Sequence, residues 1–250
     1  MTTDLLLSGA VAIAAGLVGC FAVMRRMTLA ADALSHVALP GIGLAFALGV
    51  HPLFGAAAML AFGALIVWAL EDQTRLSTET IIGVVFSVAL AVGSLMTSGE
   101  QLVEALFGRT GPLTGLEIVV GLVGAAAICV FIVREKHRLV IALVSPDIAR
   151  TARIDPRRLN LLYLQAFALT VALGLRYLGV LLMGSLIIIP AATAKRLSRN
   201  LTEMLVLAAV IAFVVTEAGT LVAAWMHRET GPVIVIIAAL VFVVSLIRPR

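Results

Sequence analysis

The sequence predicts an all-α protein, a polytopic transmembrane helical bundle, from its composition, its uncharged apolar runs and the placement of its basic residues. Of its 250 residues, 62% are hydrophobic and 13% are charged, whereas a soluble domain has about 25% charged and about half apolar residues. Residues 5–24 carry no charge over a length that matches the ~20 residues needed to cross ~30 Å of hydrocarbon. Lipid therefore solvates most of the surface, and we expect a single membrane domain over residues 1–250.

Nine apolar segments are predicted to form the membrane-crossing helices. They are residues 5–24, 29–49, 53–70, 80–97, 116–133, 160–175, 178–194, 203–224 and 232–247. The first segment lacks a preceding basic region and is followed by Arg25 and Arg26, so it is a retained helix and not a cleaved signal peptide. The sixth and seventh are short, and the chain between residues 98 and 115 can enter the membrane without crossing it. A bundle of eight helices is the alternative.

The basic residues set the predicted orientation, because cytoplasmic loops carry an excess of Lys and Arg. With the N-terminus outside and the C-terminus in the cytoplasm, 15 of the 18 basic residues fall in cytoplasmic gaps. Only Arg109, Arg176 and Arg228 fall on the outer side. The net charge of +4 thus follows the membrane boundaries, which predicts a multi-pass protein of a bacterial inner membrane and no nucleic-acid partner.

The largest cytoplasmic loop, residues 134–159, is the only substantial part predicted to lie outside the membrane. It contains a short amphipathic stretch at residues 145–154. Pro146 and Asp147 suit the first turn of a helix, since proline loses no hydrogen bond there and an acid faces the positive end of the helix dipole. Pro156 follows the predicted end. The stretch is either a surface helix at the lipid headgroups or a docking helix for a cytoplasmic partner.

Asp32 and His36 stand four residues apart in the second predicted span and therefore share one face of a helix. His36 is ten residues beyond Arg26, roughly 15 Å along a helix, which places it near the middle of the membrane. An ionised carboxylate there costs several kcal/mol unless it is paired or hydrated. Carboxylate and neutral imidazole are both good ligands for a divalent cation, whose charge would balance the acid.

Pro40 lies four residues after His36 and lacks the N–H that would bond the His36 carbonyl group. We expect a helix break at Pro40 and Gly41, which is tolerated in a membrane where the chain lines a polar path or is packed inside protein. The coincidence of acid, imidazole and helix break favours a metal contact at Asp32 and His36. The structural alternative is an Asp–His hydrogen bond that locks two helices, with Pro40 as a simple kink.

Glu217 is the other acidic residue inside a predicted span, residues 203–224. It either faces the same pathway as a third, weaker metal ligand, or it caps a neighbouring helix or pairs with Arg176. Further acidic and imidazole residues are predicted on the outer side, where they could attract cations or dock a partner, although most such residues are solvated loop groups. They are Glu100, Glu104, Glu117, His51, His227 and Glu229.

The motifs of an ATPase or of an intramembrane protease do not occur in the sequence. It has no G-x-x-x-x-G-K-[ST] phosphate loop, and neither Lys136 nor Lys195 follows a glycine, so another chain binds ATP if ATP drives this protein. H-E-x-x-H and G-x-S-x-G do not occur either. Ser35 and His36 point in different directions on a helix, which makes them a poor nucleophile and base. An enzyme is not expected.

Three stretches occur in an order that resembles one known family. RRM at residues 25–27 leads into DALSHVALPG at residues 32–41, and GVLLMGSLIIIPAATA follows at residues 179–194. These two stretches are similar to the "RRM…DALSHA.LPG" and "VG.LLV.ALLIIPAATA" signatures of the integral-membrane subunits of metal-type ABC importers for zinc, manganese or iron. The third stretch, residues 145–154, resembles the helix of that family that seats in the ATPase groove.

The resemblance implies a permease subunit that moves a divalent transition-metal ion into the cytoplasm by alternating access and holds no permanent cofactor. It implies two copies of this chain, two ATP-binding subunits and an extracytoplasmic metal-binding protein, with Asp32 and His36 on the pathway. The residues implied for ATPase docking are Ser145, Pro146, Asp147, Ile148, Ala149, Arg150, Ala152, Arg153 and Ile154. The family often has a glycine where Arg153 stands and an acid where Ser145 stands, so the docking geometry and the choice of partner are open.

The main alternative is a proton-coupled secondary metal transporter, driven through Asp32, His36 and Glu217. It would need neither an ATPase nor a docking loop. A membrane scaffold that transports nothing would leave the acid–imidazole pair without a purpose. Because Asp, His and Glu without cysteine suit zinc, manganese and ferrous iron alike, the sequence does not identify the ion.

Overall fold

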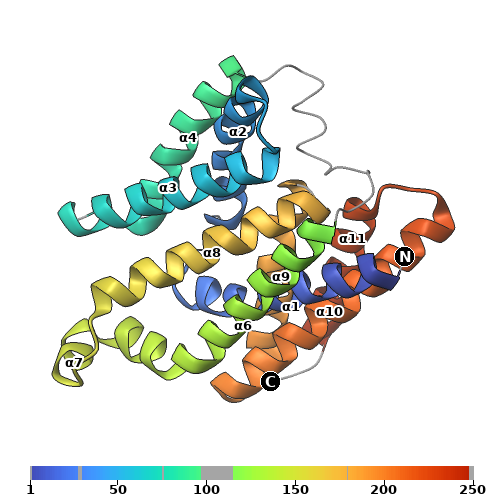
Figure 1. Ribbon diagram of the computed structural model, residues 1–250. Helices are drawn as coiled ribbons and strands as arrows, with labels where there is room; N and C mark the ends of the chain where they lie inside the picture. Colours follow the sequence, from blue (N-terminus) through green and yellow to red (C-terminus); the bar gives the residue numbers. More distant parts are fainter. Residues whose placement is uncertain (1, 28–29, 75, 97–114, 179, 248–250) are drawn as a thin grey trace.

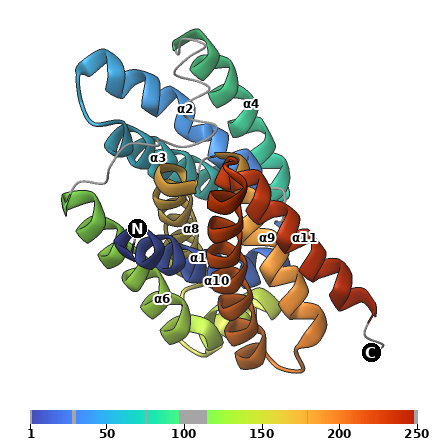
Figure 2. The ribbon, with the colours of Figure 1, turned by 90° about the vertical axis from the view of Figure 1, so that its right-hand side faces the viewer.

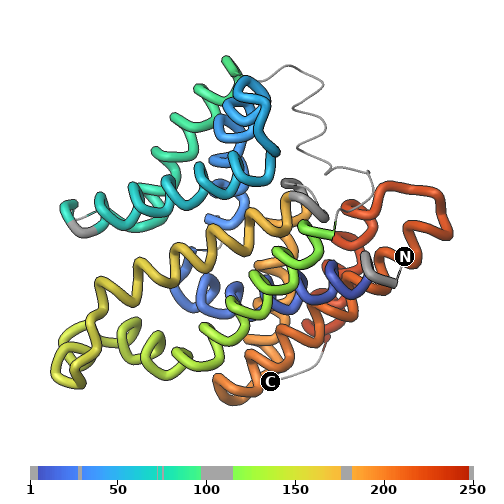
Figure 3. The backbone as a smooth tube through the Cα atoms, in the orientation of Figure 1, coloured from blue at the N-terminus to red at the C-terminus, as the bar shows by residue number. Residues whose placement is uncertain are grey.

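The computed structural model describes residues 2–27, 30–74, 76–96, 115–178 and 180–247 (Figure 1, Figure 3). Every regular element within these ranges is an α-helix, which confirms the all-α prediction. The helices are α1 (Thr2–Met24), α2 (Ala30–Leu48), α3 (Pro52–Gln73), α4 (Thr78–Met96), α6 (Gly115–Val144), α7 (Pro146–Thr151), α8 (Pro156–Leu178), α9 (Val180–Leu197), α10 (Leu201–Met226) and α11 (Thr230–Ile247). In the described ranges each of the nine predicted spans corresponds to one long helix, and α7 lies in the predicted cytoplasmic loop.

Eight helices of the described chain are long and apolar enough to cross a membrane, and α9 is outside that set. Burial differs widely among them: 83% of Leu5–Met24 in α1 is buried, against 17% of Thr230–Ile247 in α11. A strongly apolar helix that its own chain leaves bare needs an apolar solvent, so α11 faces lipid or a further apolar partner. The prediction of a multi-pass membrane bundle is confirmed.

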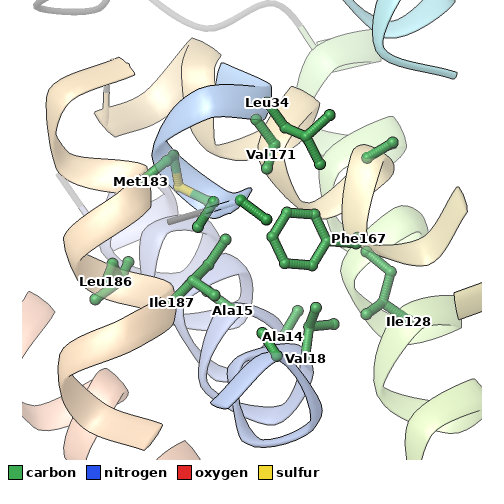
Figure 4. Close-up of a cluster of buried hydrophobic side chains, with 14 of the residues drawn as sticks. Ala14, Ala15, Val18, Leu34, Ile128, Phe167, Val171, Met183, Leu186 and Ile187 are labelled. Atoms are coloured by element: carbon green, nitrogen blue, oxygen red, sulfur yellow. The ribbon is translucent and has the colours of Figure 1, made fainter. Parts of the chain in front are cut away.

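Helix α1 runs through the interior, in contact with α6, α8, α9 and α10 (Figure 2). Its small residues Ala14 and Ala15 leave room for larger buried side chains from the surrounding helices, such as Phe167 of α8 and Met183 of α9 (Figure 4). Helices α2, α3 and α4 pack on one another as a second group, which α3 joins to α8 and α2 joins to α9 (Figure 1). The second group carries the predicted site.

Glycines set the closest helix–helix distances. A Cβ atom on Gly19 of α1 would lie 1.9 Å from the Ile187 carbonyl oxygen of α9. Gly41 of α2 and Gly55 of α3 face each other, and a Cβ on either would lie 2.2 Å from the carbonyl oxygen of the other. Small residues at such contacts let helices approach closely in lipid, where no hydrophobic force drives them together. Helices α2 and α3 are therefore joined backbone to backbone.

Four helices end with a residue in the left-handed region. These residues are Arg26, Gly49, Arg153 and His227, with φ of 60°, 66°, 57° and 51°. After each of them the next N–H group bonds the carbonyl group five positions earlier, as Met27 N bonds Ala22 O at 2.9 Å. This Schellman arrangement satisfies carbonyl groups that the helix end would leave without a partner. Glycine favours the conformation, so the three other ends hold a side chain at a steric cost.

Side-chain interactions join helix ends that the predicted topology places on the same side of the membrane. On one face, Lys136 of α6 donates to Thr202 in the first turn of α10 at 3.1 Å, and Arg196 of α9 donates to carbonyl oxygens at the end of α11 at 2.9 Å. On the opposite face, His51 Nε2, just before α3, lies 3.3 Å from the carboxylate of Glu117 in the first turn of α6. The side of the membrane on which each face lies stays a prediction.

Replacing Gly55 by alanine should force α3 away from α2, because the new Cβ would meet the Gly41 carbonyl group. We expect the free energy of unfolding to fall by about 1–3 kcal/mol, the usual cost of overpacking, and the midpoint of thermal unfolding in detergent to fall with it. Gly83→Ala in α4 is the matched control, since nothing lies within 4 Å of a Cβ there and alanine favours a helix. Equal losses of stability in both variants would contradict this role of the glycine contact.

Candidate functional site

Asp32 and His36 lie on a stripe of α2, in its part from Ala30 to Gly43, that the chain leaves uncovered. Between Ala30 and Gly43, all of which the structure describes, only Asp32, Ala33 and His36 are not buried; Asp32 is exposed and His36 is half-buried. The spacing of four residues therefore does what the sequence predicts and puts both polar side chains on one face. That face is open, whereas the other sides of the helix are packed against protein from Ala30 to Gly43.

The His36 ring is buried at its Nδ1 atom and packs beside Phe86. Its Nδ1 atom is buried without a hydrogen-bond partner, and the ring centroid lies 5.5 Å from that of Phe86 in α4, at an interplanar angle of 56°. No hydrogen bond joins His36 to Asp32 within the described residues, so nothing there supports the alternative in which such a bond locks two helices. Because Nδ1 is covered, Nε2 is the nitrogen that a ligand can reach. Phe86 gave no signal in the sequence, since it is an aromatic residue in an apolar run.

Helix α9 packs against the backbone of Asp32. A Cβ atom on Gly184 would lie 3.2 Å from both Cα and Cβ of Asp32. Two of the stretches that carry the family resemblance, residues 32–41 and 179–194, thus meet at the candidate site. A larger side chain at position 184 would displace the backbone that positions the carboxylate.

The structure does not show the predicted helix break at Pro40 and Gly41, because α2 continues through both residues to Leu48. Proline removes a single hydrogen bond, the one to the carbonyl group four residues earlier, and needs room for its ring. Gly93 of α4 gives that room, since a Cβ there would lie 3.1 Å from Pro40 Cδ. Gly41 makes the close contact with Gly55. The candidate site therefore stands on a continuous helix that packing supports.

Glu217 is not brought together with Asp32 and His36. Its Oε1 atom accepts a hydrogen bond from the Ser8 hydroxyl at 3.3 Å and lies 3.0 Å from where a Cβ on Gly9 would be, so it links α10 to the first turns of α1. Among the described residues, no three His, Cys, Asp or Glu side chains form a group that could hold a metal ion. The weaker prediction of a third ligand has no support within one chain.

The predicted outer-side residues do not gather into one metal site in the described part of the chain. His51 pairs with Glu117, and its Nδ1 also accepts the Leu53 N–H at 3.3 Å, which caps α3. His227 ends α10 in the left-handed conformation. Outside the described residues lie Glu100, Glu104 and the side chain of Arg176.

Helix α7 is built from local signals at both of its ends. The Ser145 hydroxyl accepts the Ile148 N–H at 3.4 Å, and Pro146 takes the first helical position, where the sequence predicts it. At the other end Arg153 adopts the left-handed conformation that glycine favours. The glycine that the family often has at this position therefore has a conformational reason.

The outer surface of α7 combines one apolar side chain with charged ones. Ile148 is 60% exposed, whereas Ala149 is buried against the rest of the chain. Asp147 and Arg150 form an exposed ion pair at 3.1 Å. The six-residue helix thus presents an exposed isoleucine beside charged side chains.

Comparisons with known proteins agree with this arrangement. The model of a family described as the ABC 3 transport family matches residues 1–249. The chain is 30% identical to the "High-affinity zinc uptake system membrane protein ZnuB" of Buchnera aphidicola subsp. Baizongia pistaciae, over 92% of this chain and 90% of the relative. It is 33% identical to the "Chelated iron transport system membrane protein YfeD" of Yersinia pestis, over 92% and 79%.

Relatives named for manganese are also similar. The "Manganese transport system membrane protein MntC" of Listeria monocytogenes is 26% identical, over 96% of this chain and 88% of the relative. Among solved structures, a chain of "PsaBC from Streptococcus pneumoniae in complex with Fab" superposes with a TM-score of 0.84 at 27% identity, covering 98% of this chain and 90% of that one.

Replacing Arg153 by glycine should strengthen the end of α7 by about 1 kcal/mol, because glycine adopts a positive φ without a clash of Cβ. We expect the Ile154 amide hydrogen, which bonds the Ala149 carbonyl group at 2.9 Å, to exchange with deuterium about fivefold more slowly. Gly49→Ala is the inverse control, and it should speed the exchange of the Val50 amide. Unchanged exchange in both variants would contradict the strain assigned to these ends.

Proposed function

Because the chain belongs to the ABC 3 transport family, we propose that this membrane permease subunit carries a divalent transition-metal ion into the cytoplasm. The ATPase of such a transporter is on a separate chain. Relatives named for zinc, chelated iron and manganese transport support the class of substrate. Carboxylate and imidazole ligands suit all three ions, so the site defines the class and leaves the ion open.

The observation that carries the proposal is the uncovered pair on α2. One chain offers Asp32 and His36 but no third ligand within the described residues, whereas a protein zinc site has four ligands, or three and a water molecule. We propose that a second copy presents the same stripe across a two-fold axis, since identical chains meet through identical surfaces. Two carboxylates and two imidazoles would then surround one ion.

Charge favours a transient ion at this place. Two carboxylates that face each other in the membrane interior repel one another, and each is costly there without a partner. An ion of charge +2 between them removes both penalties, and neutral imidazole adds ligands without adding charge. When the two copies move apart, the four ligands separate and the ion is released. A site that exists only in one conformation suits transport better than storage.

Alternating access would couple this site to ATP. We propose that α7 docks into an ATP-binding subunit through Ile148 and its charged neighbours, and that an extracytoplasmic protein delivers the ion at the opposite face. Closure of the ATP-binding subunits would rock the two copies and turn the site inward. The family membership leaves no need for the proton-coupled alternative.

A variant with both Asp32→Ala and His36→Ala should assemble with its partners and lose metal uptake to background. The reason is that it removes every ligand that the uncovered stripe supplies. Uptake of zinc, manganese and ferrous iron into vesicles is the measurement, with assembly checked by copurification. Ser87→Ala, which removes an exposed hydroxyl of α4 that bonds only the carbonyl group one turn earlier, should leave uptake unchanged. Normal uptake by the double variant would remove the pair from the mechanism.

Ile148→Asp should lower the amount of ATP-binding subunit that copurifies with the permease by about tenfold or more. Burying an unpaired carboxylate in an interface costs a few kcal/mol, and each 1.4 kcal/mol is about tenfold in affinity. Arg138→Ala is the control, because it breaks an exposed pair with Glu135 in the same cytoplasmic region and such pairs contribute little. Undiminished copurification would show that this face of α7 does not dock.

A further inference from the structure

The Asn160 side chain near the start of α8 bonds residues at the ends of two other helices, and a third helix joins this network through Glu71. The Asn160 amide nitrogen donates to Glu71 Oε2 of α3 at 2.7 Å, and the Asn160 amide oxygen accepts a hydrogen bond from Arg25, directly after α1. The second carboxylate oxygen of Glu71 accepts from the Thr78 hydroxyl at the start of α4. Asn160 is 89 residues from Glu71 and 135 residues from Arg25 in the sequence, so only the tertiary fold brings them together.

The Arg25 guanidinium is fixed in this network. It stacks over the ring of Tyr163, with Cζ 4.5 Å from the ring centroid. Burial lowers the pKa of Arg25 from its usual value, and the nearby Tyr163 and Glu71 oppose the shift. A guanidinium removed from water is costly without hydrogen-bond or charged partners, so breaking its contacts would cost free energy. These contacts join the ends of α1 and α3 and the starts of α4 and α8 in one network.

A second contact ties the same turn of α8 to α3. The Trp68 indole N–H donates to the Arg157 carbonyl group at 3.0 Å, and the Arg157 guanidinium stacks over the Trp68 ring at 4.7 Å. Arg157 and Asn160 are three residues apart in the first turn of α8, as Trp68 and Glu71 are in the last turns of α3. The end of α3 and the start of α8 are thus joined by two separate contacts, Trp68 with Arg157 and Glu71 with Asn160.

Only four residues separate α7 from α8. Helix α7 ends at Thr151 and α8 begins at Pro156. Asp155 Oδ1 accepts the Arg157 and Arg158 N–H groups at 3.0 and 3.2 Å, which fixes the entry into α8. Figure 1 shows α7 beside the beginning of α8. A cavity of about 350 Å³ lies between α7 and the joint, and Pro146, Arg150, Glu71 and Asn160 are among its lining residues. Helix α7 therefore has space to move toward the joint.

The other end of the connection is the candidate site. Helix α3, which carries Glu71, is joined backbone to backbone to α2 at Gly41 and Gly55. Helix α1 ends beside Arg25, and α2 begins six residues after Met24, with Asp32 in its first turn. Both partners of Asn160 are therefore connected to α2, which bears Asp32: Glu71 through the packing of α3 on α2, and Arg25 through the chain that precedes α2.

We propose that Asn160, together with Glu71 and Arg25, is the joint that converts displacement of α7 into displacement of the α2–α3 pair. These are positioning residues of the transport cycle, because they do not touch the ion. The assignment of the driving force to an ATP-binding subunit rests on the proposed function. The joint itself rests on the hydrogen bonds and stacking contacts of α1, α3, α4 and α8.

An exchange of charge tests the joint. Asn160→Asp places a carboxylate where the amide nitrogen donates to Glu71, so the two groups repel and the contact is lost. Adding Glu71→Gln restores it with the same net charge, because the new carboxylate accepts from both the Gln amide and Arg25. Ser87→Ala, which removes an exposed hydroxyl of α4 bonded to the Gly83 carbonyl group, is the control outside the network.

The readout does not depend on metal. Ala33 lies on the uncovered stripe, and Ala33→Cys, in a background with Cys20→Ala and Cys129→Ala, reports the exposure of that stripe to a water-soluble maleimide. In the purified complex with ATP-binding subunits and no added metal, we expect ATP to change the labelling rate about fivefold or more, a typical coupling between sites. Asn160→Asp should abolish this change while the subunits still copurify. The exchange variant should restore it.

A full response in Asn160→Asp, or no restoration in an exchange variant that assembles, would overturn the proposal. If Asn160→Asp does not assemble, Asn160→Ala replaces it with the same expected loss, and a response retained by Asn160→Ala would also overturn the proposal. An ATP response in a complex that moves none of the three metals would refute the proposed substrate and leave the joint intact.

Discussion

A carboxylate and an imidazole on an open stripe of α2 constrain how the rest of this molecule is arranged. In lipid, apolar side chains can remain bare, but an exposed acid costs several kcal/mol without a partner or water. The chain covers α2 from Ala30 to Gly43 everywhere except at Asp32, Ala33 and His36. One copy is therefore an incomplete membrane structure at this place. In the proposed dimer, a second copy and a doubly charged ion would complete it.

Close backbone contacts with three neighbouring helices fix the position of α2. Glycines on three neighbouring helices touch α2: Gly55 of α3 at Gly41, Gly93 of α4 at Pro40, and Gly184 of α9 at Asp32. Such backbone contacts do not let α2 slide alone. In the proposed cycle, helices α2 and α3 would move as one body, and the contacts of α3 with the start of α8 would drive that movement.

Much of this fold could be predicted from the sequence, because its signals are local. Apolar length located the nine long helices of the described chain, Pro146 and Asp147 located α7, and a spacing of four placed Asp32 and His36 on one face. The helix through Pro40 could not be predicted in this way. The rule for proline describes an isolated helix, whereas here a glycine of α4 accommodates the ring.

The remaining features depend on contacts between distant positions. Phe86 beside His36, the Asn160 network and the Glu217–Ser8 bond, which joins positions 209 residues apart, carry no sequence pattern of their own. Periodicity shows which face of a helix is polar but not which helix meets it. Glu217 illustrates the point: two acids inside predicted spans suggested one pathway, and the Glu217–Ser8 bond places Glu217 beside the first turns of α1, apart from Asp32.

The stoichiometry of metal binding tests the central claim most directly. Equilibrium dialysis of the purified permease against zinc, manganese and ferrous iron should give one ion per two chains for at least one of the metals, with binding abolished by His36→Ala. One ion per chain, or binding that persists without the imidazole, would contradict a site shared between two copies of α2.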